Sequence, residues 1–212
     1  MHDYDAVGTF EVSSGKIVVS DPCYDWGIVN SKGYELPAKN GTWGADVYRD
    51  GNMITHLVVY HSQHVIDKDY RGMHAEKAPF NVAVDSGQAG VFDSANYQND
   101  ESIAHLTDAD RLYAEEKIRW PEEPWYSWCC DRTLGEAGAG IVPNGAVSST
   151  TYGDGSYECT IVKEDGLVVG VIIDFVGEEE EEEDDDYECD DSWIYDEEDE
   201  EDEEDEEDEE EV

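Results

Sequence analysis

A very high density of acidic residues at the C-terminal end limits how much of this chain can fold. From Glu178 to Val212 the chain carries 28 of its 56 acidic residues and no Lys or Arg. Acidic residues at this density repel one another and bury too little apolar surface to offset the entropy lost on folding. We therefore expect a disordered tail over residues 177–212 and a compact β-rich domain over residues 1–176.

The net charge of residues 1–177 limits the kinds of molecule that this protein is expected to bind. Residues 1–177 hold the other 28 acidic residues and all 12 Lys and Arg, so their net charge is −16. Phosphate backbones and anionic membranes are bound by clustered cations, and the nearest pair, Lys117 and Arg119, has acidic neighbours. We expect no direct nucleic-acid partner and no membrane partner. A basic protein surface is the partner that this charge favours.

The cysteines and the N-terminal residues predict a cytoplasmic protein. Five cysteines, of which Cys129 and Cys130 are adjacent, do not form the even, spaced pattern of a disulfide framework. Residues 1–5 lack the basic start and apolar core of a signal peptide. The longest apolar run, residues 167–175, contains Gly170 and Asp174 and is too short to span a bilayer.

Turn residues divide the domain into short apolar runs, which is typical of strands. The last run, residues 167–175, has few polar positions and predicts a central strand covered on both faces. Three hairpins are predicted around short turns: 9–12 with 16–20, 42–49 with 53–61, and 157–163 with 167–175. The expected fold class is mainly β (α+β), an antiparallel β-sandwich or partly open barrel of short strands with one or two short helices.

Two segments carry helix signals. Thr107 or Asp108 can cap a helix that runs to about Ile118. The second predicted helix runs from Pro124 to Leu134, with Pro in its first turn and Gly135 after its end. Trp125, Trp128 and Cys129 then share one inward face. For the aromatic cluster of Trp125, Tyr126 and Trp128 we expect core packing, and a ligand platform is the alternative. Residues 135–145 are expected to form a flexible connection.

Carboxylates recur at the predicted strand ends and turns. The four are Asp21, Asp85, Asp93 and Asp154. Asp93 is also a candidate binding residue, together with the polar residues Ser86 and Gln88 of the same block. If the fold brings these ends together, the four carboxylates can hold Ca²⁺ or Mg²⁺ or divide acid and base roles in a hydrolase. The alternative is ordinary turn chemistry, because Asp before Pro or Gly starts turns. No cofactor is required by the leading hypothesis below.

Cys23 is the best candidate for a catalytic nucleophile, because it lies in a turn with polar neighbours. A cysteine nucleophile needs a base and an electropositive setting, and no histidine lies near it in the sequence. Acidic surroundings raise the pKa of a thiol. A buried structural cysteine is therefore the preferred interpretation.

The acidic tail contains one apolar island. Its members are Tyr187, Trp193, Ile194 and Tyr195. Aromatic residues among acidic ones are a recurring docking composition in disordered segments. The alternative is a solubilising tail in which these side chains bind nothing.

Three blocks in the domain resemble a known family. Residues 15–24, with Ser14 before them, resemble an SGxxxxxDP opening. Residues 84–93 contain VDSGQAGVFD, and residues 148–175 contain GDGSY and end in Asp-Phe. In this order they resemble domain-of-unknown-function family 4241 of bacteria and phages. Cys23 and Tyr24, the longer middle block and the acidic tail depart from the family pattern. The resemblance implies fold and domain limits and a phage or mobile-element source, but no activity.

The leading hypothesis is a non-enzymatic intracellular interaction protein whose acidic tail binds, or competes for, a basic protein surface. The alternative is a metal-assisted hydrolase that uses Asp21, Asp85, Asp93 and Asp154. A third hypothesis is a Ca²⁺ buffer acting through the tail alone, which leaves the domain unexplained.

Overall fold

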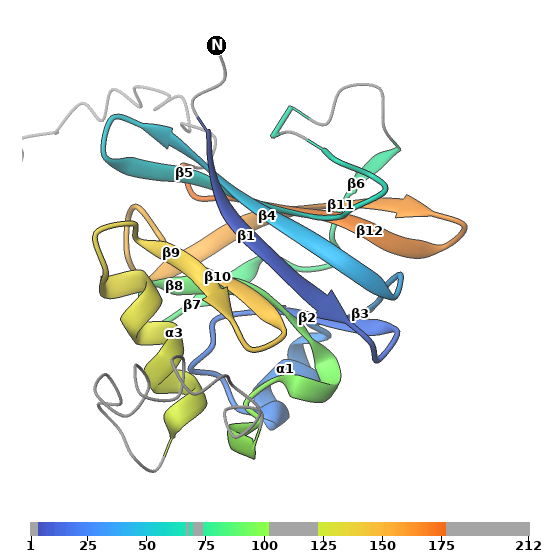
Figure 1. Cartoon of the computed structure of the whole chain (residues 1–212), viewed down its shortest axis with the longest axis horizontal. Coiled ribbons are helices and arrows are strands. Elements are labelled where there is room, and N and C mark those ends of the chain that lie inside the picture. The colour runs from blue at the N-terminus through green and yellow to red at the C-terminus, as the bar shows by residue number, and fades with distance from the viewer. Residues whose placement is uncertain (1–3, 67, 70–73, 102–122, 177–212) are drawn as a thin grey trace, which may run out of the picture. The chain divides into compact units, whose positions relative to one another are not determined.

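The computed structural model describes residues 4–66, 68–69, 74–101 and 123–176, and these form two antiparallel sheets (Figure 1). They all belong to one compact unit that ends at Glu179. The two sheets do not close into a barrel. The predicted mainly β, sandwich-like fold class is therefore confirmed.

The larger sheet has seven strands. Its order is β1 (Tyr4–Val12), β4 (Gly41–Asp50), β5 (Met53–His61), β12 (Leu167–Asp174), β11 (Gly155–Glu164) and β6 (Ala75–Lys77), and β7 (Val82–Val84) also pairs with β11. The predicted hairpins β4–β5 and β11–β12 are confirmed. β12 lies between β5 and β11, and its residues 168–173 are all buried, as its apolar sequence predicts.

The smaller sheet has five strands in the order β3 (Glu35–Pro37), β2 (Lys16–Ser20), β8 (Gln88–Asp93), β10 (Gly145–Ser149) and β9 (Ala139–Val142). All six residues of β8, at its centre, are buried. The prediction of a flexible connection over residues 135–145 is wrong, because β9 and the start of β10 lie there and pair with each other. Each of these two strands begins with one Gly and one Ala, which left little strand signal.

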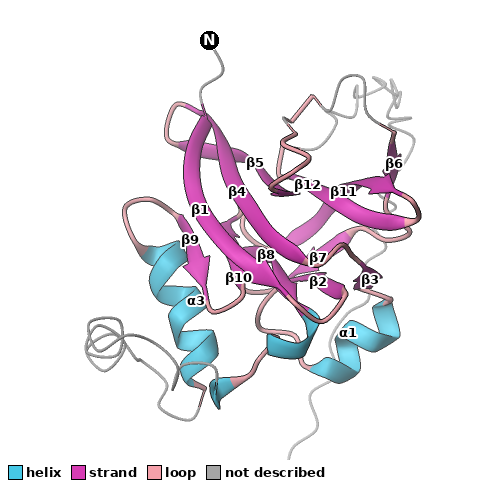
Figure 2. Cartoon of the chain, turned by 45° about the vertical axis from the view of Figure 1, so that its right-hand side comes forward, coloured by secondary structure: helices cyan, strands magenta, loops and turns pink. Residues whose placement is uncertain are grey.

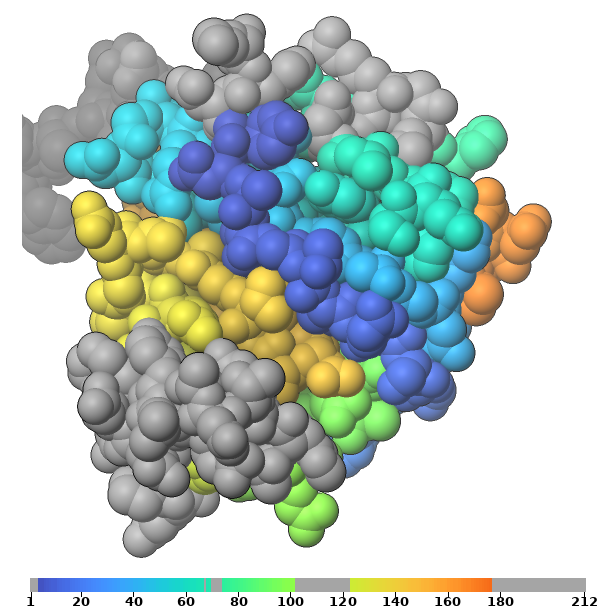
Figure 3. All heavy atoms as spheres, in the orientation of Figure 1, coloured from blue at the N-terminus to red at the C-terminus, as the bar shows by residue number. Residues whose placement is uncertain are grey.

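The third predicted hairpin, between β1 and β2, is wrong. β1 pairs with β4 in the larger sheet, and β2 pairs with β3 and β8 in the smaller one. The turn at Ser13–Gly15 therefore carries the chain from one sheet to the other. Figure 3 shows β1 on one face of the molecule, between β4 and β5 on one side and β9 and β10 on the other.

The main core lies between the two sheets. Its largest fully buried members come from both sheets and include Trp43, Leu57, Ile173 and Ile17. Apolar side chains at alternate strand positions meet in this layer, which is the packing of a sandwich. Burial of this apolar surface is the main force that holds the sheets together.

A second core lies between the smaller sheet and two helices, α1 (Trp26–Lys32) and α3 (Pro124–Leu134), which Figure 2 shows on its outer side. A short 3-10 helix, η1 (Ser94–Asn96), follows β8. The prediction of α3 is confirmed at both ends, and Trp125, Trp128 and Cys129 are buried as expected. α1 was not predicted, although Asp25 caps its first turn and Gly33 ends it at a φ of 71°. The helix expected over 107–118 lies outside the described residues.

Candidate functional site

Three of the turns singled out in the sequence meet at one end of the smaller sheet. Asp21 follows β2, the turn 85–87 joins β7 to β8, and Asp154 precedes β11. The carboxylate of Asp21 accepts hydrogen bonds from the backbone amides of Asp85 and Ser86. Asp154 Oδ1 accepts a hydrogen bond of 3.0 Å from the amide of Gly87, in the same turn. The fold therefore brings Asp21, Asp85 and Asp154 into one neighbourhood.

Asp21 is fully buried, and its carboxylate is surrounded by hydrogen-bond donors. Oδ2 accepts from the amides of Asp85 and Ser86 at 2.9 and 2.8 Å. Oδ1 accepts from the Cys23 amide at 2.8 Å and from Ser86 Oγ at 2.6 Å. Four donors satisfy a buried charge that would otherwise be costly. Asp21 thus joins the end of β2 to the β7–β8 turn.

The fourth carboxylate lies elsewhere. Asp93 is at the opposite end of β8 from the 85–87 turn, and its carboxylate accepts hydrogen bonds from Ser13, Ser14 and the Ala95 amide. Burial raises the pKa of Asp93, but these hydrogen bonds outweigh it and hold the pKa below its usual value. Asp93 therefore anchors the crossing between the two sheets.

The geometry of the four carboxylates does not favour metal chemistry. Within the described part of the chain, no group of three or more His, Cys, Asp or Glu side chains is placed to hold a metal ion. Both oxygens of Asp21 are already hydrogen-bonded, and Asp85 and Asp154 are exposed. The hydrolase hypothesis required all four carboxylates in one pocket, and Asp93 is not with the others.

Cys23 lies beside this network and is partly buried. Burial, followed by the negative charge of Asp21, raises the pKa of its thiol to about 12, although a hydrogen bond with Ser86 opposes the shift. The thiol is therefore protonated at neutral pH, whereas a nucleophile needs the thiolate. This environment suits a structural cysteine rather than a catalytic one.

Ser86 and Gln88, the candidate binding residues, make internal contacts. Ser86 Oγ donates to Asp21, and the Gln88 amide nitrogen lies 3.4 Å from both Ser86 Oγ and Cys130 Sγ. Gln88 is buried, and its Oε1 has no hydrogen-bond partner. Both side chains therefore hold the β7–β8 turn against α3.

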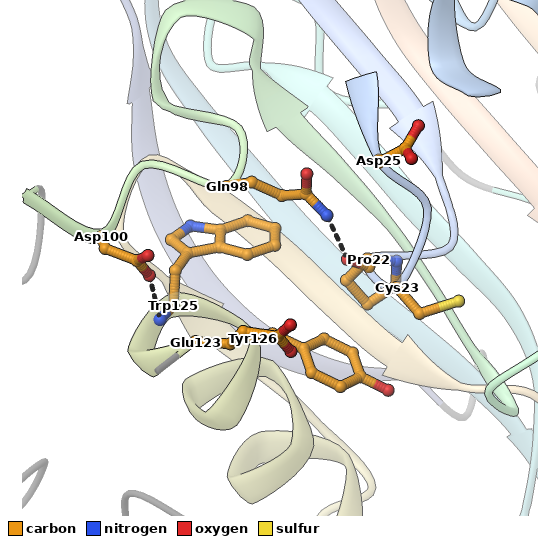
Figure 4. Close-up of a pocket in the computed structure, with 8 residues that line it drawn as sticks. All are labelled: Pro22, Cys23, Asp25, Gln98, Asp100, Glu123, Trp125 and Tyr126. Carbon is orange, nitrogen blue, oxygen red and sulfur yellow. Dashed lines mark hydrogen bonds between the residues drawn. The ribbon is translucent and has the colours of Figure 1, made fainter. Parts of the chain in front are cut away.

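Next to this network is a pocket with a volume of about 330 Å³ (Figure 4). Pro22 and Cys23 from the turn after β2 form part of its wall, and Trp125 and Tyr126 from α3 form another part. Three carboxylates also line it: Asp25, Asp100 and Glu123. Sequence reasoning missed all three, because they lie far apart in the chain. For Asp25 and Glu123 the sequence did offer a signal, because each is the residue immediately before a helix, α1 and α3 respectively.

A wider groove, of about 750 Å³, lies where β1, the β4–β5 turn and the residues before β9 meet, on the face shown in Figure 3. Its cation, Arg49, donates to Asp5 at 2.7 Å and to the Ala137 carbonyl at 2.5 Å. The positive charge of Arg49 in this groove is therefore already paired with Asp5.

Comparison with known proteins adds no relative. No family model, no curated protein and no solved structure matches the chain. The resemblance carried by the three sequence blocks therefore stays a prediction.

The candidate docking residues of the tail lie outside the described residues: Tyr187, Trp193, Ile194 and Tyr195. In the part of the chain that the structure describes, no helix has both the length and the apolar character to span a membrane.

Proposed function

We propose that this protein is a non-enzymatic interaction protein whose acidic C-terminal segment binds, or competes for, a basic surface on a partner protein. The observation that carries the proposal is the distribution of charge, with 28 acidic residues and no Lys or Arg after residue 177. Opposite charge on a partner steers encounter and selects against acidic surfaces.

The domain has few cations to offer this segment. Five of its eight described Lys and Arg form ion pairs within the domain: Lys16–Glu35, Lys39–Glu164, Arg49–Asp5, Lys77–Glu158 and Lys163–Glu76. Lys68 and Arg132 lie over the rings of Tyr48 and Trp128. The 28 acidic charges therefore exceed what the domain can neutralise, which favours a basic partner.

The described chemistry gives more support to binding than to catalysis. The carboxylate of Asp21 is engaged by four internal donors, and the thiol of Cys23 is held protonated. The four described cysteines are free thiols: Cys23, Cys129, Cys130 and Cys159. Free thiols fit the intracellular location that we propose. A phage or mobile-element origin belongs to the same proposal and rests on the three sequence blocks.

The test is affinity capture from a lysate of the source cells. The bait is the full chain. In its matched control, the amide variant, every Asp after residue 177 is replaced by Asn and every Glu by Gln. These replacements keep the length of the chain and the size of each side chain but remove the negative charges. Each bait is washed at about 0.1 M and about 1 M salt, between which the Debye length falls from about 10 Å to about 3 Å.

We expect the full chain to retain one or a few basic proteins at low salt, and to lose them at high salt or in the amide variant. The retained protein should then bind the full chain when both are purified. Equal retention by the amide variant, or partners without a basic surface, would contradict the proposal.

A further inference from the structure

The chain contains two Asn-Gly pairs, Asn40–Gly41 and Asn144–Gly145. In such a pair the backbone nitrogen of the glycine can attack the side-chain carbonyl carbon, Cγ, of the asparagine, because glycine has no Cβ to obstruct the approach. Attack forms the N–Cγ bond of a succinimide ring and breaks the Cγ–Nδ2 bond. The amide group leaves as ammonia, which carries away the glycine proton. Water then opens the ring and leaves aspartate or its isomer isoaspartate.

The surroundings of Asn40 favour this attack. Asn40 lies in the short connection between β3 and β4 and is exposed, so water reaches it. Its Oδ1 accepts a hydrogen bond of 2.6 Å from the Gly15 amide. Negative charge develops on this oxygen when the nitrogen of Gly41 attacks Cγ, so the Gly15 amide is a donor aimed at the developing charge. No described residue binds Nδ2, the group that departs.

A second donor acts on the backbone carbonyl of Asn40. His61 Nδ1 accepts from the Gln63 amide at 3.2 Å, so the proton of the neutral ring is on Nε2. Nε2 lies 3.2 Å from the Asn40 carbonyl oxygen and therefore donates to it. The amide of Gly41 loses its proton during the attack, and the negative charge that results is shared with this carbonyl oxygen. His61 is only 5% exposed, a setting that strengthens such a hydrogen bond.

His61 also lies close to Gly41 itself. A Cβ at position 41 would be 2.8 Å from His61 Nε2, and Gly41 has a φ of 131°, which favours glycine. Gly41 is the first residue of β4 and pairs with β1 alone. The fold therefore requires, at the end of a strand, the residue type that obstructs ring closure least.

The second pair has a different environment. The Asp93 amide binds the backbone carbonyl of Asn144, but no described residue donates to the Asn144 side-chain oxygen. Gly145 is buried, pairs with both β8 and β9, and packs against the ring of Phe92. Ring closure at Asn144 would therefore require Gly145 to leave the sheet. Asn144–Gly145 is the matched control that the chain itself offers.

We propose that Asn40 is a site of spontaneous covalent modification, at which the chain converts its own asparagine to aspartate and isoaspartate through a succinimide with Gly41. Water is the only other reactant. The reaction adds a negative charge next to Lys39. It also alters the contact with Gly15, in the turn that carries the chain between the two sheets. The inference is independent of the proposed function.

The test follows both pairs in one sample. The full chain is kept at neutral pH and physiological temperature, digested at intervals, and its peptides are weighed by mass spectrometry. Conversion of Asn40 and of Asn144 is read from the mass gain of an acid over an amide, and isoaspartate is identified by its enzymatic methylation. A second sample is kept in urea, where the local sequence alone sets the two rates.

In the folded chain we expect Asn40 to convert at least tenfold faster than Asn144, whereas in urea the two rates should agree within about twofold. His61→Phe keeps a ring beside Gly41 but removes the donor, and it should slow Asn40 at least fivefold. His61→Gln retains a side-chain donor and should keep the rate within about twofold. The rate of Asn144 should be unchanged in both variants, which shows that they are folded.

Equal rates of Asn40 and Asn144 in the folded chain would overturn the proposal. An unchanged rate of Asn40 in His61→Phe, with Asn144 still slow, would overturn it as well. A difference between the two rates that persists in urea would assign the effect to local sequence and not to the fold. If a fast Asn144 shows that His61→Phe is unfolded, the comparison of the unsubstituted chain in buffer and in urea decides instead.

Discussion

The clearest test of how the domain is held together is the substitution Asp21→Asn. It keeps the size of the side chain but replaces one carboxylate oxygen with an amide nitrogen. Oδ2 accepts from two backbone amides, of Asp85 and Ser86, whereas Oδ1 accepts from the Cys23 amide and from Ser86 Oγ. The asparagine nitrogen is tolerated better at the Oδ1 position, because the Ser86 hydroxyl can rotate and accept.

The cost follows from the contacts that remain. In the better orientation, the Cys23 amide faces a second donor and loses its partner, which costs about 1–3 kcal/mol for a buried group. The hydrogen bonds of Asp85 and Ser86 are then made to a neutral rather than a charged acceptor and are roughly halved in strength. Together these losses amount to about 2–4 kcal/mol of unfolding free energy.

Urea unfolding of the full chain, followed by tryptophan fluorescence, measures this loss. With a urea slope of about 2 kcal/mol per molar, the midpoint should fall by about 1–2 M at unchanged slope. The matched control is Asp154→Asn, which is exposed and keeps its acceptor for the Gly87 amide, so its effect should be within about 0.5 kcal/mol. Equal midpoints for the two variants would refute the assignment of Asp21 as the structural centre of these turns.

Three further predictions concern pH, thiol reactivity and packing. Burial lowers the pKa of His56, so the folded state binds a proton less readily than the unfolded state. The contribution of His56 to the free energy of unfolding should be complete above about pH 6.5. It should fall as the pH drops below that value, by at most about 1.4 kcal/mol per pH unit. The thiol of Cys23, with a pKa of about 12, should react with iodoacetamide at neutral pH at least tenfold more slowly than free cysteine. Gly90→Ala should destabilise the domain by about 1–3 kcal/mol, because the new Cβ would lie 2.6 Å from the Ala146 carbonyl oxygen and closer still to the Phe92 ring.

Each of these predictions has a defined contrary result. His56→Gln should flatten the loss of stability between about pH 7 and about pH 5.5, and an unchanged slope would assign that loss to other groups. Peptide mapping should show slow alkylation at Cys23 in the folded chain and fast alkylation in urea, and equal rates would contradict the buried, protonated thiol. An unchanged urea midpoint for Gly90→Ala would contradict the close approach of β8 and β10.

Local chemistry made much of the fold predictable. Asp50-Gly51-Asn52 separates two apolar runs, and β4 and β5 form the expected hairpin around it. α3 was predictable because Pro124 and Gly135 mark its two ends. These signals act over a few residues and depend little on the rest of the chain.

Long-range contacts made the remainder unpredictable. Ser13–Gly15 has the composition of a hairpin turn, but Asp93, 80 residues from Ser13, holds it as a crossing between sheets. The pocket likewise joins Asp25, Asp100 and Glu123, which no local spacing relates. The convergence of Asp21, Asp85 and Asp154 was an open alternative in the sequence, since it depended on the order of strands.

The central claim, that the acidic segment binds a basic partner surface, is tested most directly by equilibrium binding. Fluorescence anisotropy with the purified captured partner gives the dissociation constant of the full chain and of the amide variant at about 0.1 M and about 1 M salt. The account predicts that the full chain binds at least tenfold more tightly than the amide variant at low salt, and that high salt removes most of this difference. Equal affinities of the two chains at low salt would contradict it.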